Sequence, residues 1–153
     1  MSGMGVSILK AYLGRRYRLS ASHRLHTERL SEAENRSVYG KCANPHGHGH
    51  NYTVEVLVGG EINAATGMIC DLTELDGWVS REVLEPFDHQ NLNMLEPFEN
   101  RVPTTENLCI EIERRLRTAL RADLALTVRV EETSNNFFEY REDSEGDKMG
   151  LSG

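Results

Sequence analysis

One stretch of eleven residues, from Cys42 to Tyr52, constrains the fold of this chain more than any other. It reads CANPHGHGHNY, and its three histidines stand two residues apart. Polar and apolar residues then alternate from Tyr52 to Val58, as in a strand with one buried face. If this strand extends back to His48, then His48 and His50 point to the same face, about 7 Å apart along the backbone.

Two imidazoles on one face of a strand are a candidate metal site. They can converge on one zinc ion with bonds of about 2.0–2.1 Å. Gly47 and Gly49 carry no side chains, so they permit the close approach of a ligand or of another backbone. The alternative is a histidine-rich turn in which His46, His48 and His50 are solvated. We favour metal binding because the histidines are internal and lead directly into a strand.

Length, charge and cysteine content exclude several other classes. The 153 residues predict one domain, and the net charge of −7 argues against nucleic-acid binding as the main function. There is no apolar run of roughly 18 residues, so we expect no membrane span. Cys42, Cys70 and Cys109 are widely spaced, and the N-terminus lacks the pattern of a secretory signal. We therefore expect reduced thiols and a cytoplasmic protein.

The order of the remaining elements predicts an α+β fold. Strands are expected at 8–22, 52–58, 126–130 and 138–140, and helices at 71–85 and 104–120. This order, β-β-α-α-β-β, gives a four-stranded antiparallel sheet with two helices on one face. Such a sheet has two open edges, which pairing between subunits would close.

The connecting segments and the chain ends complete this prediction. The polar segment 27–41 is expected to be a long functional loop, and Pro86 is expected to end the first helix. We expect the single domain to occupy residues 8–141, after an N-terminal tail at 1–7. The acidic, glycine-rich residues 142–153 are expected to form a disordered tail.

Two residues near the histidines are candidates for the same site. His23 follows the first predicted strand, where it would be either a third ligand or a surface histidine. Three protein ligands and one open position are typical of a catalytic zinc. Cys42 lies six residues before His48, close enough to be a ligand or a reactive thiol.

Three charged or titratable residues stand further along the chain. Asp88 and His89 place a carboxylate beside an imidazole, a combination that can relay protons. Glu132 continues the alternation of the apolar positions 126, 128 and 130. It is therefore either a carboxylate on the inner face that needs a partner, or the point at which the strand reaches solvent.

Six motifs together resemble a known family. They are SASHRL, GKCANPHGHGHNYTV, GEINAATGMICDL, DHQNLN, PTTEN and VEETSNN, and they run from about Tyr17 to Tyr140. In this order they are similar to the 6-pyruvoyl-tetrahydropterin synthase family. The resemblance implies the tunnelling fold, in which three subunits join their sheets into a barrel and two trimers stack as a homohexamer.

The resemblance also implies a zinc centre and a catalytic set. The zinc ligands implied are His23, His48 and His50, which leaves His46 out. Cys42 matches the catalytic thiolate. Asp88 and His89 match the other catalytic pair, which a neighbouring subunit usually supplies.

Substrate-binding residues follow from the same resemblance. Glu132 matches the carboxylate that holds the amino-pyrimidine edge of a pterin through charge-assisted hydrogen bonds. Thr104, Thr105 and Glu106 match a segment at a helix start that assists pterin binding. The basic residues that would bind the substrate's phosphates are not assigned, and Arg15, Arg16, Arg24 and Lys41 are the candidates.

The implied reaction is that of a carbon–oxygen lyase acting on 7,8-dihydroneopterin triphosphate. Zinc would act as a Lewis acid, Cys42 would take a carbon-bound proton, and triphosphate would be eliminated in an internal redox rearrangement. Mg²⁺ is a second candidate ion, accompanying the triphosphate. The partners expected are the pterin substrate and further copies of the chain, with no nucleic acid and no membrane.

Two alternatives belong to other functions. The sister enzyme of queuosine biosynthesis, 6-carboxy-5,6,7,8-tetrahydropterin synthase, shares the fold, the zinc and the thiolate, but usually has three residues between the cysteine and the first ligand histidine. Here five residues, Ala43 to Gly47, separate Cys42 from His48, as in the pyruvoyl type. A non-catalytic zinc- or pterin-binding module is the second alternative, and the presence of Cys42, Asp88 and His89 argues against it.

Overall fold

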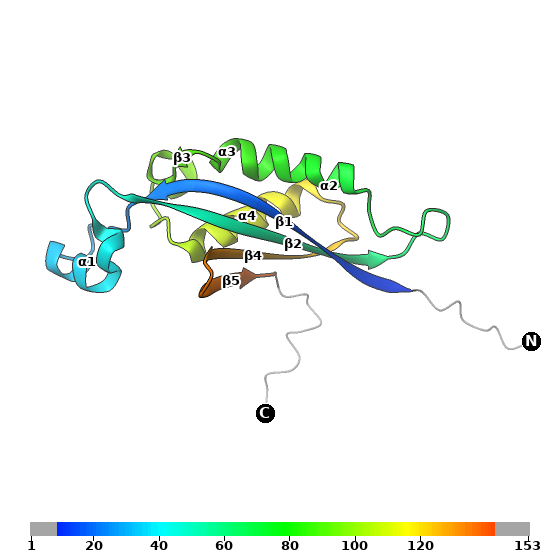
Figure 1. Cartoon of the computed structure of the whole chain (residues 1–153), viewed down its shortest axis with the longest axis horizontal. Coiled ribbons are helices and arrows are strands. Elements are labelled where there is room, and N and C mark those ends of the chain that lie inside the picture. Colours follow the sequence, from blue (N-terminus) through cyan, green and yellow to red (C-terminus); the bar gives the residue numbers. More distant parts are fainter. Residues whose placement is uncertain (1–8, 143–153) are drawn as a thin grey trace, which may run out of the picture.

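The computed structural model describes residues 9–142 as one sheet with helices packed on one of its faces (Figure 1). This agrees with the predicted α+β fold. The tails predicted at 1–7 and 142–153 lie outside the described residues, apart from residue 142. Among the helices of the described residues, none is long and apolar enough to cross a membrane.

The sheet contains the four predicted strands and one short additional strand. The strands are β1 (Lys10–His23), β2 (His48–Glu61), β3 (Gln90–Asn91), β4 (Ala125–Thr133) and β5 (Asn136–Tyr140). Their order across the sheet is β3-β1-β2-β4-β5, and every pairing is antiparallel except that of β3 with β1. A strand of two residues has no sequence period, so it could not be predicted from the pattern.

The register of β1 against β2 is continuous over the full length of both strands. It begins with Lys10 opposite Glu61 and ends with His23 opposite His48. The inward positions near the end of β1 are Leu19, Ala21 and His23, all of them buried. β2 begins at His48, as the metal-site hypothesis required, so the register places three histidines at one end of the sheet.

The helices are α1 (Glu32–Tyr39), α2 (Leu72–Val79), α3 (Glu85–Phe87) and α4 (Thr105–Ala119). A π-helical turn at Ser80–Leu84 joins α2 to α3. The prediction that Pro86 ends the first helix is wrong by one residue, since helix continues to Phe87. Pro86 directly follows the π-helical turn and lies one residue before the end of this continuous run, where its missing N–H interrupts little further helix.

α2 and α4 supply the other half of the core. Their apolar stripes pack on the inward side chains of β1, β2 and β4. The residues at the centre of the core, none of them measurably exposed, are Val54, Val56, Val58, Leu75, Val79, Leu108, Ile112, Leu116, Val128 and Val130. In Figure 1, α1 lies apart from this layer, at the end of the sheet where β1 ends and β2 begins.

The prediction that residues 27–41 form a loop without secondary structure is wrong. Ser31 caps α1 by accepting a hydrogen bond from the Glu34 N–H. Asn35, only 1% exposed, then ties the segment together through its side-chain amide. Its Nδ2 lies 3.0, 3.2 and 3.0 Å from the carbonyl oxygens of Thr27, Leu30 and Ser31, and its Oδ1 accepts from the Thr27 N–H at 2.9 Å. A polar hub of this kind has no hydrophobic period, which is why the sequence pattern missed the helix.

Asn35→Ala should loosen the segment 26–45 while leaving the sheet intact. Removing the amide leaves several backbone groups without hydrogen-bond partners, at a local cost of about 1–3 kcal/mol. Hydrogen exchange followed by mass spectrometry should show faster exchange in 26–45 and unchanged exchange in β2 and β4. Asn35→Asp keeps the acceptor but places a carboxylate oxygen against three carbonyl oxygens, so its effect should be at least as large. Asn100→Ala, at an exposed position, is the control, and equal exchange in Asn35→Ala and Asn100→Ala would contradict the role of Asn35.

Candidate metal centre and active site

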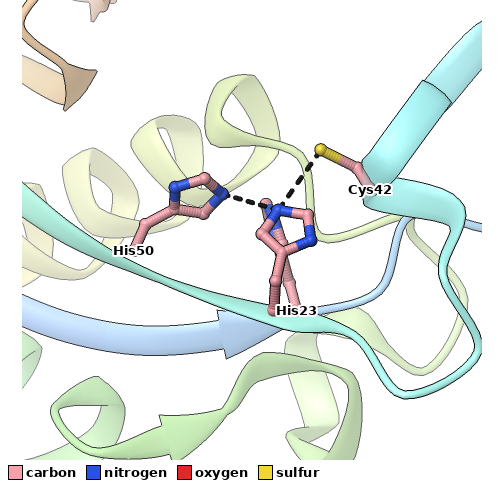
Figure 2. Close-up of side chains that lie close together, drawn as sticks. His23, Cys42 and His50 are labelled. Carbon is pink, nitrogen blue, oxygen red and sulfur yellow. Dashed lines mark hydrogen bonds between the residues drawn. The ribbon is translucent and has the colours of Figure 1, made fainter.

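Three imidazoles and one thiol converge at the end of β1 and the start of β2. The group consists of His23, Cys42, His48 and His50, whose potential ligand atoms all lie within 4.8 Å of one another. His48 and His50 extend from β2, and Cys42 extends from a 3-10 turn at Gly40–Ala43. Figure 2 shows the Cys42 side chain pointing from this turn toward the imidazoles. The arrangement brings donors from three separate segments to one point.

The spacing of the two β2 imidazoles suits a shared ion. The Nε2 atoms of His48 and His50 are 2.8 Å apart, and the Cys42 Sγ is 3.4 Å from the His48 Nε2. Two ligands of a tetrahedral zinc with bonds of about 2.0–2.1 Å are separated by about 3.3 Å. The separation of the two nitrogens is therefore close to the edge of such a tetrahedron.

His23 is held in the tautomer that a metal ligand requires. Its Nδ1 donates a hydrogen bond to the carbonyl oxygen of Pro103 at 2.8 Å, which leaves the lone pair on Nε2. That Nε2 is buried and has no hydrogen-bond partner in the described part of the chain. Because buried polar atoms are nearly always satisfied, this nitrogen fits a position that an ion completes. Of the two alternatives for His23, the structure excludes the surface histidine.

Burial favours the neutral form of two of these imidazoles, His23 and His50. The pKa of His23 is lowered mainly by burial, and the pKa of His50 is lowered for the same reason. Neutral imidazole is the form that binds metals. His46, the histidine that the resemblance leaves out, is exposed and lies outside the group.

The protein by itself disfavours the thiolate of Cys42. Burial raises the pKa of this thiol, and the negative charge of Glu132 raises it further. A bound cation at the histidines would have the opposite effect, because positive neighbours stabilise a thiolate. Burial likewise raises the pKa of Cys70, and it raises the pKa of Cys109 to about 12.

Glu132 lies on the inner face beside the histidines. Its Oε1 is 3.3 Å from the His50 Nε2 and 4.0 Å from the His23 Nε2. Its side chain is 16% exposed, and its Oε2 accepts a hydrogen bond from the Asn136 Nδ2 at 3.2 Å. The strand has therefore not reached solvent at this position, and the carboxylate faces the same space as the metal-ligating group.

Asp88 and His89 lie at the edge of β1, outside this group. The Asp88 Oδ1 accepts a hydrogen bond from the Ser20 N–H at 2.9 Å, and the His89 N–H donates to the Ser20 carbonyl at 2.6 Å. His89 has a φ of 58°, and its side chain is 81% exposed. Within one chain, the pair is thus anchored to β1 while His89 is presented to the exterior.

The segment before α4 reaches the site mainly through its backbone. Thr104 caps α4 by accepting a hydrogen bond from the Asn107 N–H at 3.2 Å. Thr105 is buried and Glu106 is exposed. The contact with the histidines comes from the carbonyl of Pro103, one residue before the cap.

Sequence reasoning missed the residues that hold these segments in place. The side chain of Asn93 binds both backbone groups of Arg24, accepting from its N–H at 2.7 Å and donating to its carbonyl at 2.9 Å. The Leu25 N–H donates to the Cys42 carbonyl at 2.7 Å, which fixes the cysteine turn against the end of β1. The DHQNLN motif contains Asn93, but its spacing carries no signal of the partner 69 residues away.

One glycine in the histidine stretch is required by the structure. Gly47 has a φ of +67°, and a Cβ there would lie 2.8 Å from the carbonyl oxygen of His23. Any side chain would strain the backbone and push the start of β2 away from the end of β1. The residue between His46 and His48 therefore fixes the approach of the two strands that carry the ligands.

The chain is similar to proteins of one family. Residues 12–143 match the family described as 6-pyruvoyl tetrahydropterin synthase. The 6-pyruvoyl tetrahydrobiopterin synthase of Poecilia reticulata is 47% identical, over 85% of this chain and 89% of the relative. The human protein of the same name is 44% identical, over 86% of this chain and 92% of the relative. The structure of Caenorhabditis elegans 6-pyruvoyl tetrahydropterin synthase aligns with a TM-score of 0.84 at 39% identity, covering 89% of this chain and 98% of that one.

His48→Ala should release most of the bound zinc while the fold is kept. The histidine supplies one of the converging nitrogens and lies at a strand end that is partly exposed, so its loss removes a ligand without opening the core. Zinc measured by mass spectrometry after dialysis should fall from one ion per chain to well below that, with an unchanged circular dichroism spectrum. His46→Ala is the matched control and should keep its zinc. Full zinc occupancy in His48→Ala would refute the proposed ligand set.

Proposed function

Since the chain belongs to the 6-pyruvoyl tetrahydropterin synthase family, we propose that it is a zinc-dependent lyase that converts 7,8-dihydroneopterin triphosphate into 6-pyruvoyl-tetrahydropterin. The reaction releases inorganic triphosphate and contributes to tetrahydrobiopterin biosynthesis. The observation that carries the proposal is the convergence of His23, His48, His50 and Cys42 within 4.8 Å, with Glu132 beside them.

His23, His48 and His50 would hold the zinc ion. The buried, partnerless Nε2 of His23 and the close Nε2 atoms of the other two histidines fit three ligands around one centre. When bound, zinc supplies a Lewis acid that polarises the substrate's side-chain hydroxyls and acidifies the hydrogens on the carbons that bear them. Three protein ligands would leave an open position at which substrate could bind.

Cys42 would act as the base that removes a carbon-bound proton. Its Sγ lies 3.4 Å from the His48 Nε2, and its side chain is partly exposed, so it can face a substrate bound at the histidines. As protons leave the side chain, the carbon–oxygen bond to the triphosphate breaks and its electron pair leaves with the triphosphate. Oxidation of a hydroxyl-bearing carbon to a carbonyl is balanced by reduction of a C=N bond in the ring, so no external oxidant is required.

Glu132 would hold the pterin ring. Its carboxylate faces the histidines from the neighbouring strand, and it can accept hydrogen bonds from the amino-pyrimidine edge of the ring. Thr104, Thr105 and Glu106 would border the ring, since the Pro103 carbonyl just before them reaches His23. A substrate held at Glu132 would place its side chain toward His50 and Cys42.

Asp88 and His89 would serve the site of a neighbouring copy. The side chain of His89 is 81% exposed, which supports a role for its imidazole in the site of a neighbouring copy. The Asp88 Oδ2 lies 3.6 Å from the His89 Nε2 and would orient this imidazole as it shuttles protons. The open sheet edges at β3 and β5 support assembly by edge pairing, and we propose a homohexamer of two stacked trimers.

The 6-carboxy product is the second candidate because it would use the same zinc and thiolate. The five residues between Cys42 and His48 favour the pyruvoyl product. Just before them, the Cys42 carbonyl accepts a hydrogen bond from the Leu25 N–H, and their last residue, Gly47, lies against the His23 backbone. The length of this segment would set where the thiol stands relative to the substrate side chain.

Mass spectrometry of the products formed from 7,8-dihydroneopterin triphosphate tests the proposed reaction. The zinc-loaded protein should yield 6-pyruvoyl-tetrahydropterin and inorganic triphosphate. Cys42→Ala should keep zinc and pterin binding but lose turnover by a factor of about 10³ or more, as expected when a group acting in the transition state is removed. Cys70→Ala is the control and should keep its activity.

Other outcomes would separate the alternatives. A 6-carboxy product would assign the chain to the sister reaction. Pterin binding without any product would identify a non-catalytic module. If Cys42→Ala turns over substrate at the wild-type rate, a residue other than Cys42 is the base.

Mixing two inactive variants tests whether sites are shared between copies. Cys42→Ala lacks the proposed base, and His89→Asn lacks the imidazole while keeping a residue that tolerates positive φ. After subunit exchange in equal amounts, about a quarter of the sites in a symmetric assembly should contain both intact groups. Recovered activity near that level is expected. No recovery after exchange verified by native mass spectrometry would show that each site is completed within one chain.

A further inference from the structure

A basic hollow lies between α1 and the turn that carries Cys42. It has a volume of about 300 Å³. Three cationic residues contribute to its lining, namely Arg24, Arg36 and Lys41. Of the described residues, Glu32 is the one carboxylate on the lining. The lining includes neither the group of His23, Cys42, His48 and His50 nor Glu132. The proton chemistry proposed for those residues therefore gives the three cations no role.

These three cations are unpaired among residues 9–142. Most other arginines bind a carboxylate, as Arg15 does with Asp76 at 2.7 Å and Arg16 with Glu55 at 2.6 Å. No carboxylate oxygen of the described residues lies within 4.0 Å of Arg24, Arg36 or Lys41. In a chain with a net charge of −7, unpaired cations gathered around one hollow indicate an anionic ligand.

The hollow and the reaction centre share one turn. Arg24 directly follows the ligand His23, and its Nε donates to the Ala43 carbonyl at 3.3 Å. Lys41 and Ala43 flank Cys42, and both line the hollow. The turn that carries the thiol therefore also contributes to the lining of the hollow.

A line of short contacts leads from Glu132 to this turn. The Glu132 Oε1 is 3.3 Å from the His50 Nε2, which is 2.8 Å from the His48 Nε2. The His48 Nε2 in turn is 3.4 Å from the Cys42 Sγ. A substrate with a ring at Glu132 and its reacting carbons at the histidines would thus extend its far end toward the Cys42 turn.

We propose that this hollow binds the triphosphate of the substrate through Arg24, Arg36 and Lys41. The proposal rests on the proposed function, because it takes the ring position at Glu132 from it. Arginine matches phosphate oxygens with its planar fork, and lysine adds a point charge. Of the basic candidates in the sequence, Arg24 and Lys41 are then assigned, whereas Arg15 and Arg16 are engaged by Asp76 and Glu55. Arg36, on the helix that the sequence did not predict, becomes the third member.

Charge-neutralising variants test the hollow directly. Arg36→Gln and Lys41→Gln leave the Arg24 contact with Ala43 in place, and Arg29→Gln is the matched control at an exposed position outside the hollow. Calorimetry with inorganic triphosphate as the probe should give affinities about tenfold weaker for each single variant and weaker still for the double variant, as expected for the loss of charge-assisted contacts. Zinc content is measured in parallel, because triphosphate also binds zinc.

Steady-state kinetics supply the second measurement. The double variant should raise KM for dihydroneopterin triphosphate and the inhibition constant of inorganic triphosphate together. Its affinity for dihydroneopterin, which lacks the phosphates, should equal that of wild type. Inorganic orthophosphate should bind far more weakly than triphosphate, which distinguishes a polyphosphate site from a site for any free phosphate.

The outcomes separate this proposal from the proposed function. If the wild type binds inorganic triphosphate and the double variant does not, the hollow is a polyphosphate site even in a protein that forms no pterin product. If the double variant keeps wild-type KM and wild-type triphosphate affinity, the hollow is not the site, whatever the activity. Equal affinity for orthophosphate and triphosphate, or equal losses in Arg29→Gln, would also overturn the proposal.

Discussion

The antiparallel register between β1 and β2 is the constraint on which the rest of the site depends. It places His23 opposite His48 and Ala21 opposite His50, so that one strand end contributes two imidazoles and its neighbour the third. Side chains alternate between faces with a period of two, and a slip of one residue would turn His48 and His50 toward the opposite face. The long apolar alternation of both strands, buried against α2 and α4, makes such a slip costly. The core therefore sets the metal geometry from a distance.

Backbone groups from distant segments then fix what the register brings together. The Pro103 carbonyl selects the tautomer of His23, the Asn93 amide binds the backbone of Arg24, and the Cys42 carbonyl accepts from Leu25. Each contact satisfies a polar group that burial would otherwise make costly. The buried Nε2 of His23 is the exception, and its lack of a partner among residues 9–142 is the physical reason for assigning it to an ion. Stability and ligand geometry are thus obtained from the same hydrogen bonds.

Opposing charges surround the thiol. Burial and Glu132 both raise the pKa of Cys42, while a cation at the histidines would act in the opposite direction. Different residues would contact the three parts of the proposed substrate. The carboxylate would bind the ring, the imidazoles and the thiol would face the reacting carbons, and the cations would bind the phosphates. A chain that is acidic as a whole can act on a polyanion because its unpaired positive charge is local.

The sequence by itself determined the α+β fold and the strand from Tyr52, because period-two alternation is a local property of the chain. That this strand begins at His48, and that Glu132 faces inward, was left open by the sequence and decided by the structure. The resemblance of its motifs to the family is borne out by the comparisons, whereas the individual site roles stay predictions. Three further features were decided only by tertiary structure. α1 depends on the hydrogen bonds of the Asn35 side chain, and the two-residue β3 depends on pairing with β1. The sequence left open whether His23 is a ligand or a surface histidine, and the structure shows it buried and bonded to the Pro103 carbonyl. Asp88 and His89 are adjacent in sequence, yet their anchoring on Ser20 places them outside the metal-ligating group. Each of these depends on partners far along the chain, and hydrogen bonds between distant segments leave no period in a sequence.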